Sequence, residues 1–333
     1  MSKCKVSIIM PAYNAEKTIK KAINSCLNQS LEEIELIIID DCSTDSTRDI
    51  LIAIKNDNSD KVKVYFQEKN AKQGAARNRG FKEAEGEYIL FVDSDDWIER
   101  DACKKLYECA IKDDCDEVVG DYALVYDSGE KKQVKVFDSV KDILGKQNTN
   151  SHEILLQQPG YFCCKLYKKE FLKKIFPEGK LFPEFVRYED SAFNTLTTIQ
   201  ADKIEKVDYC FYNYYQNASS TVRDISAQLD KIEVAKYLLD TKFAQNEYRD
   251  LILYKCTVLC GAALLYGILP LYGSEKELCK KCLEEINKIM PELYRGRQYQ
   301  NVQKDMRKQL EQNWKHPRCY LLKLAIHEIL QKR

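Results

Sequence analysis

The chain has 333 residues, 44% of them hydrophobic, a composition that supports a sizeable core and argues against wholesale disorder. Lysine and arginine number 52, as do aspartate and glutamate, so the formal net charge is zero and gives no support for nucleic-acid binding. No signal-like apolar segment opens the chain, because Met1–Lys5 leads straight into a strand-like run. We therefore expect a cytoplasmic protein.

The first 125 residues alternate between apolar strands and amphipathic helices. Four runs are typical of buried strands: Val6–Met10, Ile34–Ile39, Val62–Phe66 and Tyr88–Val92. Helical spacing and capping residues predict three intervening helices: residues 15–27, a helix capped by Ser43 or Thr44 that ends near Lys55, and Ala75–Ala84. This alternation predicts a mainly parallel sheet with helices on both faces.

The remainder of the chain is mixed and then helical. Residues 115–225 contain a possible hairpin, Val118–Val125 with Val134–Phe137, and a tyrosine-rich segment, Tyr209–Tyr215, that we interpret as strand packing. The pattern is helical from Ser226 onward. The expected organisation is a domain over residues 1–225, with halves 1–125 and 126–225, followed by a helical region over 226–333.

One uncharged stretch, Cys256–Ser274, could suggest a membrane span. The part before Pro270 is too short to cross a bilayer, so we predict a buried core helix there.

Polar residues follow three of the predicted strands, where a parallel sheet binds its ligands. They are the segments Pro11–Asn14, Asp40–Ser43 and Asp93–Asp96. The first glycine in the chain is Gly74, which excludes a dinucleotide fingerprint or a P-loop after the first strand. Carboxylates with a hard cation are the remaining means of neutralising phosphates, and Asp93 and Asp95 suit Mg²⁺ or Mn²⁺. The alternative is an ordinary acidic surface loop.

The order and spacing of four segments resemble the family 2 glycosyltransferases, which have a GT-A fold. The segments are Val6-Ser-Ile-Ile-Met-Pro-Ala-Tyr-Asn14, Ile39-Asp-Asp-Cys-Ser-Thr-Asp45, Gly74-Ala-Ala-Arg-Asn-Arg-Gly80 and Phe91-Val-Asp-Ser-Asp-Asp-Trp97. A weaker resemblance to the acceptor-side half of the family continues through Lys165–Lys168, Phe176–Gly179 and Tyr188–Asp190. Two departures stand out: Cys42 replaces a frequent glycine, and the loop from Gly179 to Tyr188 is longer than usual.

The resemblance implies a role for each matching residue. Pro11, Ala12 and Tyr13 would line a uracil pocket, and Asp41 would accept a hydrogen bond from the base. Lys72 or Arg77 would approach the nucleotide or its phosphates. Asp93 and Asp95 would form the D-x-D pair, with Asp95 in direct contact with the metal, and Asp190 would be the catalytic base. Three further residues would also contact the substrate: Ser94, Trp97 and Glu189.

Each of these residues also has a simpler interpretation. Tyr13 could cover the sheet edge, and Trp97 could be ordinary core. Arg77 and Arg79 could be surface charges on a helix. Asp190 could cap the helix that follows it.

The resemblance implies inverting transfer of a sugar from a nucleotide diphosphate donor, with a UDP-sugar preferred, to a saccharide acceptor. The family's common acceptors are a growing cell-surface polysaccharide or a lipid-linked oligosaccharide. A sugar-phosphate nucleotidyltransferase is one alternative, but that class has a glycine-rich loop after the first strand. A non-catalytic sugar-nucleotide-binding module is another, and the intact Asp93, Asp95 and Asp190 argue against it.

The C-terminal segment has a basic, amphipathic character. Residues 300–333 carry eight lysines and arginines against three acidic residues, and Leu322, Ile326 and Ile329 recur at helical spacing. Such a helix can lie on an anionic membrane, which here would be the inner face of the plasma membrane. The alternative is a helix packed on its own domain with a solvated basic face.

Overall fold

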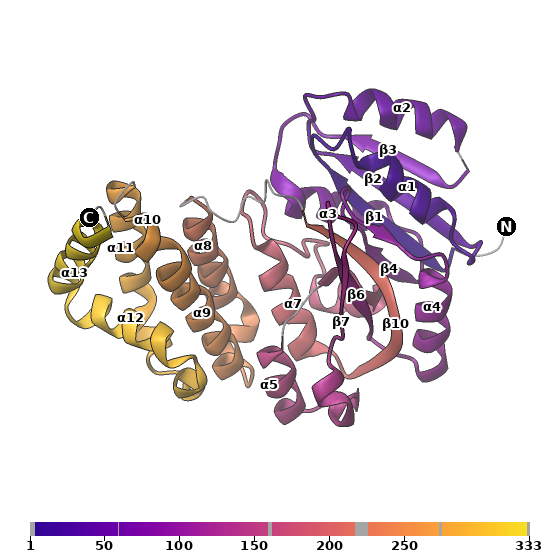
Figure 1. Cartoon of the computed structure of the whole chain (residues 1–333). Helices are drawn as coiled ribbons and strands as arrows, with labels where there is room; N and C mark the ends of the chain where they lie inside the picture. Colours follow the sequence, from indigo (N-terminus) through magenta and orange to yellow (C-terminus); the bar gives the residue numbers. More distant parts are fainter. Residues whose placement is uncertain (1–3, 59, 159–161, 217–225, 273–274, 332–333) are drawn as a thin grey trace. The chain divides into compact units, whose positions relative to one another are not determined.

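The computed structural model describes residues 4–58, 60–158, 162–216, 226–272 and 275–331 (Figure 1). The chain divides into two compact units, and the division falls inside one helix. The first unit is Met1–Phe185 with Leu196–Ala218, and the second is Val186–Thr195 with Ser219–Arg333. The boundary expected near residue 225 lies outside the described residues. A sheet flanked by helices and a C-terminal helical region confirm the expected α/β class.

The first half of the sheet is parallel, as predicted. Its strands are β1 (Val6–Ala12), β2 (Ile34–Asp40), β3 (Val62–Phe66) and β4 (Tyr88–Phe91). They lie in the order β3-β2-β1-β4, and every residue of β1, β2 and β4 is buried. Continuous burial on both faces explains why these strands are apolar without alternation. Pro11 lacks an N–H, and it is tolerated in β1 because the pairing with β4 ends at Ile9 and Phe91.

The second half of the sheet is mixed. The strand β9 (Lys165–Lys168) runs antiparallel to both β4 and β6 (Glu117–Tyr126), and β10 (Lys203–Gln216) is parallel to β6. Three short strands pair at the margins: β5 (Trp97–Ile98), β7 (Lys131–Val134) and β8 (Gly145–Lys146).

The predicted hairpin exists, but its second strand was placed wrongly. The strand that pairs with β6 is Lys131–Val134, not Val134–Phe137. A tight turn begins at Tyr126, whose N–H donates to the Glu130 carbonyl, and Gly129 takes a φ of 83° in that turn. The apolar Val136 and Phe137 then leave the strand and are buried in the core.

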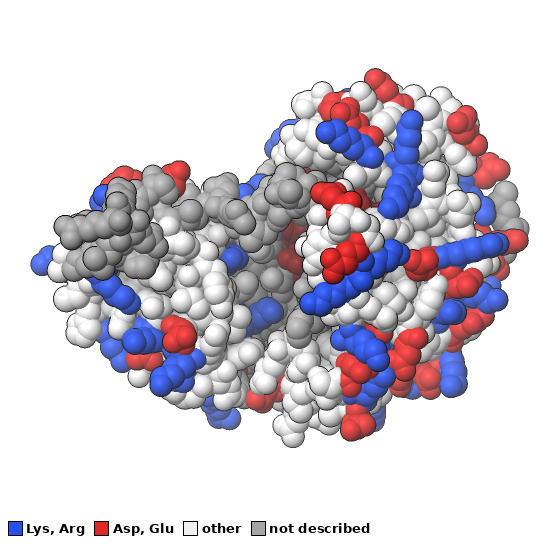
Figure 2. Space-filling view, viewed as in Figure 1, with Lys and Arg blue, Asp and Glu red and all other residues white. Residues whose placement is uncertain are grey.

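Helices flank the sheet of the first unit (Figure 1). They are α1 (Ile19–Leu27), α2 (Thr47–Asp57), α3 (Lys72–Glu83), α4 (Ala102–Asp113), α5 (Thr149–Gln157) and α6 (Lys169–Ile175), with 3₁₀ turns η1 (Asp138–Ile143) and η2 (Phe162–Cys164). Helix α3 packs on β1 and β2. Their closest approach is at Gly80, where a Cβ atom would come within 2.5 Å of Ile9. Basic and acidic side chains are interspersed on the face of this unit drawn in Figure 2.

Two helix starts differ from the prediction. Helix α2 begins at Thr47 rather than next to Ser43 or Thr44, because those two residues bind the loop after β1 instead. The Asn14 N–H donates to Ser43 Oγ at 3.0 Å, and the Thr44 N–H donates to Asn14 Oδ1 at 2.8 Å. Helix α3 begins at Lys72, three residues before the predicted start.

The second unit is built from helices. They are the start of α7 (Glu189–Gln200), α8 (Ser226–Asp240), η4 (Lys242–Gln245), α9 (Arg249–Ala263), the π-helical turn η5 (Leu264–Ile268), α10 (Leu269–Leu271), α11 (Lys276–Leu293), η6 (Arg297–Asn301), α12 (Lys304–Lys315) and α13 (Pro317–Gln331). Helix α9 packs against α8, α11 and α12, which makes it the centre of this unit.

The helical run through α9 is longer than predicted. Among the described residues, Arg249–Ile268 is long and apolar enough to cross a membrane by length and composition alone. The expectation that this stretch is too short to span a bilayer is therefore wrong. Of its most apolar window, 67% is buried inside the protein, as in the core helix of a helical bundle. The expected burial of this segment agrees with that packing.

Candidate active site

The loops after β1 and β2 and the start of α3 hold three non-glycine residues in the left-handed backbone region. Asn14 has a φ of 49°, and Cys42 and Lys72 each have a φ of 65°. Such conformations cost of order 1–3 kcal/mol and concentrate at functional sites, where the surrounding structure enforces them. The position of Cys42 also accounts for the frequent glycine in the family, because glycine adopts this φ without strain.

The ends of β1 and β2 bring the predicted base-binding residues together. The Asp41 N–H donates to the Ala12 carbonyl at 2.8 Å, which joins the two loops. Pro11, Ala12 and Asp41 are buried, whereas the Tyr13 side chain is 48% exposed. An exposed ring next to a buried carboxylate offers one stacking surface and one polar group.

The Asp41 carboxylate already accepts several hydrogen bonds, one of them from the backbone N–H of Lys72. Its Oδ1 accepts from Gln67 Nε2 at 2.6 Å and from the Ala71 N–H at 2.9 Å. Burial raises the pKa of the Asp41 carboxyl above its ordinary value, and these hydrogen bonds oppose the shift. Gln67 was not predicted as a site residue, because glutamine after a strand carries no distinctive signal. Lys72 follows Ala71 directly, so the chain places it beside this carboxylate.

Arg77 lies inside the protein, and its interpretation as a surface charge is wrong. The residue is 1% exposed, and its Nη2 atom lies 2.7 Å from Asp93 Oδ1. The guanidinium carbon lies 4.6 Å and 5.4 Å from the ring centroids of Phe162 and Phe182. Arg77 therefore reaches the acidic loop through Asp93. By contrast, Arg79 on the same helix is exposed.

The acidic loop after β4 places Asp93, Ser94, Asp95 and Asp96 in one turn, closed by the Asp96 N–H on the Asp93 carbonyl at 3.1 Å. Burial and the charge of Asp93 raise the pKa of Asp95 to about 6, although the Asp95 side chain keeps contact with solvent. Burial and the charges of its two neighbours also raise the pKa of Asp96 well above its ordinary value. An isolated surface loop would leave its carboxylates solvated and separate, so the simple interpretation does not account for this crowding.

The two outer carboxylates of the loop differ in their ion pairing. Among the described residues, Asp95 forms no ion pair, whereas Asp93 is paired with Arg77. No group of three or more His, Cys, Asp or Glu in the described part of the chain could hold a metal ion. One or two carboxylates would thus supply part of a coordination shell, and diphosphate oxygens and water would complete it, as is usual for Mg²⁺.

Trp97 follows the acidic loop in β5 and is half-buried. The Lys21 ammonium lies 2.8 Å from the centre of its ring, a cation–π contact. The backbone of Trp97 pairs with Asn213 of β10. Because the ring carries a cation on one face and retains some exposure, Trp97 is not ordinary core.

The predicted base and its neighbour belong to the second unit, at the start of α7. Glu189 is 3% exposed and Asp190 is half-buried. Asp190 is the second residue of the helix, and its Oδ1 accepts from the N–H of Ser191 at 2.9 Å. Tyr188 precedes the pair with a φ of 62°, another strained position for a bulky residue. Both carboxylates thus lie in the first turn of the helix, where the helix dipole favours a negative charge.

Besides Gln67, two more residues of the site were missed, Tyr212 and Asp96. The Tyr212 hydroxyl donates to Asp96 Oδ2 at 2.6 Å, and the Asp93 N–H donates to the Tyr212 oxygen at 3.2 Å. Strand packing was therefore an incomplete interpretation of this tyrosine. Asp96 lies in the Asp93–Asp96 motif, and its place in this motif could have identified it as a site residue from the sequence.

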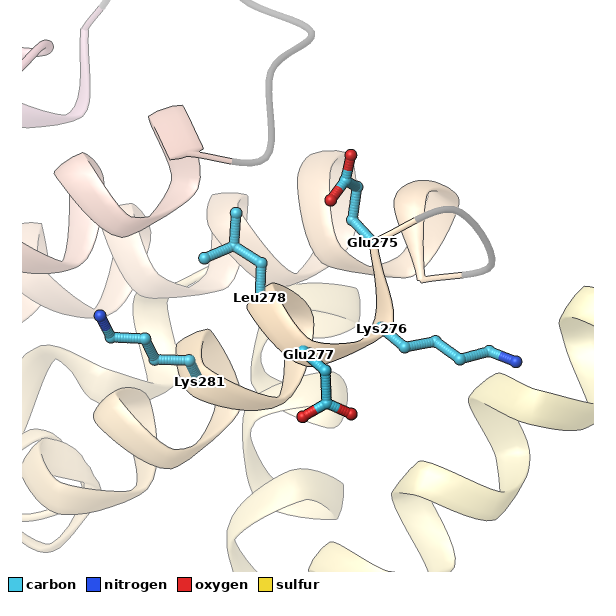
Figure 3. Close-up of a pocket in the computed structure, with 5 residues that line it drawn as sticks. All are labelled: Glu275, Lys276, Glu277, Leu278 and Lys281. Atoms are coloured by element: carbon cyan, nitrogen blue, oxygen red, sulfur yellow. The ribbon is translucent and has the colours of Figure 1, made fainter.

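A groove in the second unit is lined by none of the predicted site residues (Figure 3). It lies at the start of α11, and its lining residues are Glu275, Lys276, Glu277, Leu278 and Lys281. The groove is open and carries both signs of charge, so it has no converging set of groups.

Comparison with known proteins agrees with the geometry. Residues 7–176, just over half of the chain, match the model of glycosyl transferase family 2. The putative glycosyltransferase EpsH of Bacillus subtilis is 31% identical over 255 residues, which cover 73% of this chain and 72% of EpsH. The poly(ribitol-phosphate) beta-glucosyltransferase of Bacillus spizizenii is 33% identical over 216 residues, which cover 62% of this chain and 32% of that protein.

A solved structure shares the fold. The crystal structure of S. aureus TarS 1-349 in complex with UDP-GlcNAc matches with a TM-score of 0.64 and 23% identity, and the match covers 94% of this chain and 92% of that one. The mixed α/β fold with a helical C-terminal region is thus similar to that of the TarS glycosyltransferase. The chain belongs to glycosyl transferase family 2.

Proposed function

We propose that this glycosyltransferase moves a sugar from a UDP-sugar to a saccharide acceptor with inversion, in the synthesis of a cell-surface polysaccharide or a lipid-linked oligosaccharide. The observation that carries the proposal is the acidic loop at the carboxyl edge of the sheet, where the pKa of Asp95 is raised to about 6 and no cation pairs with it among the described residues. The TarS complex supports a uridine donor, because its bound ligand is UDP-GlcNAc.

The nucleoside would bind at the ends of β1 and β2. Tyr13 has the exposure needed to stack on a base, and the Asp41 carboxylate would accept a hydrogen bond from a base N–H. Pro11 and Ala12 would form the apolar wall of the pocket. Lys72 would extend from the start of α3 toward the nucleotide.

The diphosphate would bind beside the acidic loop with Mn²⁺ or Mg²⁺. Asp95 would contact the metal, Asp93 would contribute while held by Arg77, and the metal would neutralise charge on the leaving diphosphate. Ser94 and Trp97 flank the metal-binding carboxylate and would contact the donor. Burial and then the charge of Asp93 raise the pKa of Asp95, and a bound cation would offset both effects by stabilising the ionised carboxylate.

The reaction is a single displacement. The acceptor oxygen bonds to the anomeric carbon, the bond from that carbon to the diphosphate oxygen breaks, and the diphosphate leaves with the bonding electron pair. The acceptor's proton passes to a base, for which Asp190 is our candidate, with Glu189 as its neighbour in the substrate-binding set. One displacement converts an α-linked donor to a β-linked product.

The relative from Bacillus spizizenii is named as acting on poly(ribitol phosphate), a polymer of a sugar alcohol and phosphate. This name supports a polymeric acceptor for the present chain. The identity of the donor sugar is open among glucose, galactose and their N-acetylated forms.

A donor screen tests the proposal. Thermal shifts are measured with UDP-glucose, UDP-galactose and their N-acetyl forms, each with and without Mn²⁺, and GDP-mannose serves as the mismatched donor. A hundredfold excess of donor over its Kd should stabilise the fold by about 2.7 kcal/mol. We expect a shift only with a UDP-sugar and Mn²⁺ together. Shifts that are equal for all nucleotides, or independent of Mn²⁺, would contradict the proposal.

The base is tested by Asp190→Asn, which keeps the shape and removes the charge. We expect normal folding and normal metal-dependent UDP binding, with transfer lowered by about 10²–10⁴-fold. Retained transfer would exclude Asp190 as the base and make Glu189 the next candidate. A lost melting transition would indicate a structural role instead.

A further inference from the structure

The acidic loop is tied to β10 by a chain of buried hydrogen bonds. The Asp93 N–H donates to the Tyr212 oxygen at 3.2 Å, and the Tyr212 hydroxyl donates to Asp96 Oδ2 at 2.6 Å. The Tyr215 N–H donates to Asp96 Oδ1 at 2.8 Å. Tyr212 is 0% exposed and Asp96 is 1% exposed, so water does not compete for these bonds.

Both oxygens of Asp96 are therefore engaged, one by a hydroxyl and one by a backbone N–H. A carboxylate in this state is oriented toward β10 and is not offered to a cation. The Asp93 side chain, by contrast, is 25% exposed, and Asp95 is exposed to solvent. The three aspartates of the loop thus have two different functions, although the sequence presents them as one acidic run.

The same network fixes Asp93 from two directions. Its backbone N–H is held by Tyr212, and its carboxylate is held by Arg77 at 2.7 Å. The exit of the loop is fixed as well, because Asn213 Nδ2 donates to the Trp97 carbonyl at 3.3 Å and the Glu99 N–H donates to the Phe211 carbonyl at 2.8 Å.

We propose that Tyr212 and Asp96 form a positioning pair that holds the backbone of the acidic loop so that Asp93 and Asp95 meet the metal and the diphosphate in one fixed arrangement. This inference rests on the proposed function of the loop. Neither residue contacts substrate, and each acts through the residues that do. A loop whose backbone is held to within fractions of an ångström binds its ion without reorganisation. Loss of the hydrogen bonds that hold it should therefore weaken metal binding before it unfolds the protein.

The test uses Tyr212→Phe, which removes one oxygen and keeps the ring. UDP binding is measured by calorimetry over a range of Mn²⁺ concentrations, at a temperature well below the melting transition. We expect the Mn²⁺ concentration for half-maximal UDP binding to rise about tenfold or more, the usual effect of losing a hydrogen bond to a charged group. UDP binding without metal should change by less than about twofold, because the hydroxyl bonds to Asp93 and Asp96 of the acidic loop and not to the proposed base-binding residues.

Two further variants sharpen the result. Asp96→Asn should raise the Mn²⁺ requirement similarly, and the double variant should cost no more than the larger single change, because both break one chain of bonds. Asp96→Asn also supplies the measurement if Tyr212→Phe does not fold. Tyr65→Phe is the matched control, since it removes a hydroxyl that donates to Glu83 at 2.9 Å elsewhere in the same unit. It should leave the Mn²⁺ requirement unchanged.

The outcomes separate this inference from the proposed function. If the parent protein binds UDP equally with and without Mn²⁺, the proposed metal site is wrong. If the parent requires Mn²⁺ but Tyr212→Phe and Asp96→Asn merely lower the melting temperature, with an unchanged Mn²⁺ requirement, the pair is structural and the inference is overturned.

Discussion

Asp95 combines an elevated pKa of about 6 with a location where a cation is expected. Metal binds the ionised carboxylate, so protons compete with metal below that pKa. We expect the Mn²⁺ concentration for half-maximal UDP binding to be constant above about pH 6 and to rise by up to about tenfold per pH unit below it. Calorimetric titrations from about pH 5 to pH 7.5 measure this. A midpoint independent of pH across that range would contradict the assignment.

The same pKa shift has the opposite consequence for the metal-free fold. Because the pKa of Asp95 is higher in the folded chain than its ordinary value of 3.8, the folded state holds the proton more tightly. The contribution of Asp95 to the free energy of unfolding therefore falls as the pH rises from about 4 to about 6. Asp95→Asn should raise the metal-free melting temperature at pH 7 and leave it unchanged near pH 4. Solvent contact reduces the size of the effect and not its sign.

Cys42 offers a test of backbone strain at the same edge of the sheet. At a φ of 65°, a glycine is favoured over any residue with a Cβ atom. We expect Cys42→Gly to be more stable to unfolding than Cys42→Ala by about 1 kcal/mol, which reverses the usual order of the two residues. Thermal melts of both variants measure the difference. An alanine variant that equals or exceeds the glycine variant would show that the position is not strained.

At the scale of elements, α3 joins two parts of the first unit. Its Arg77 holds the acidic loop, and the next residue, Asn78, holds the loop after α6. The Asn78 amide donates to the Phe182 carbonyl and accepts from the Phe182 N–H, both at 2.9 Å, as a strand partner would. Asn78 thus orders a segment that lies 104 residues further along the chain.

Asn78→Ala should remove these two bonds to the Phe182 backbone and a third bond, from Asn78 Nδ2 to Glu184 Oε1 at 3.1 Å. We expect the free energy of unfolding to fall by about 2–4 kcal/mol. Arg79→Ala, an exposed neighbour on the same helix, should change it by no more than about 0.5 kcal/mol. Denaturant melts of the two variants give the comparison. Equal losses would mean that the Asn78 bonds contribute nothing beyond helix propensity.

The sequence was sufficient to predict the strands and helices of the first half of the sheet. It was insufficient to predict which strands pair in the second half. Val6–Met10 and Ile34–Ile39 are apolar throughout because both faces are buried, and such runs are recognisable locally. The strand β9 was missed because its four residues carry no local signal and its partners lie far away in sequence. The burial of Arg77 depends on Phe162 and Phe182, which lie more than 80 residues further along the chain.

The candidate site shows the same division. The resemblance and the strand ends indicated Asp41, Asp93 and Asp95 from the sequence. The role of Asp96 depends on Tyr212, which lies 116 residues away, and no local pattern encodes that contact. Side chains that face a ligand are thus easier to infer from a motif than those that hold the motif in place.

At the scale of the whole molecule, the helical unit raises the question of membrane contact. In α12 and α13, Leu322 is 62% exposed, and Lys315, Arg318 and Lys323 are also exposed. Neighbouring charge on Lys308 contributes to a lowered pKa of Lys323, after the larger effect of burial. The side chains of Ile326 and Ile329 lie outside the described residues. We propose that this surface binds anionic lipid and places the protein at the inner face of the plasma membrane.

Vesicle sedimentation tests the proposal on the full chain. Replacing Lys315, Arg318 and Lys323 by alanine should lower binding to phosphatidylglycerol vesicles by about 3 kcal/mol, roughly 1 kcal/mol for each charge. The matched control replaces three exposed lysines of the first unit, Lys55, Lys61 and Lys112. Equal sedimentation of the parent and the C-terminal variant would exclude this surface, and equal losses in both variants would indicate a non-specific charge effect.

The central claim is that a divalent cation at Asp95 joins the nucleotide diphosphate to this protein. Calorimetric titration of UDP into the parent and into Asp95→Ala, each with and without Mn²⁺, tests it most directly. We predict that Mn²⁺ strengthens UDP binding to the parent by at least about tenfold, the effect of a charge-neutralising contact of about 1.4 kcal/mol. The variant should bind UDP equally weakly in both conditions. A variant that binds UDP as tightly as the parent in the presence of Mn²⁺ would contradict the account.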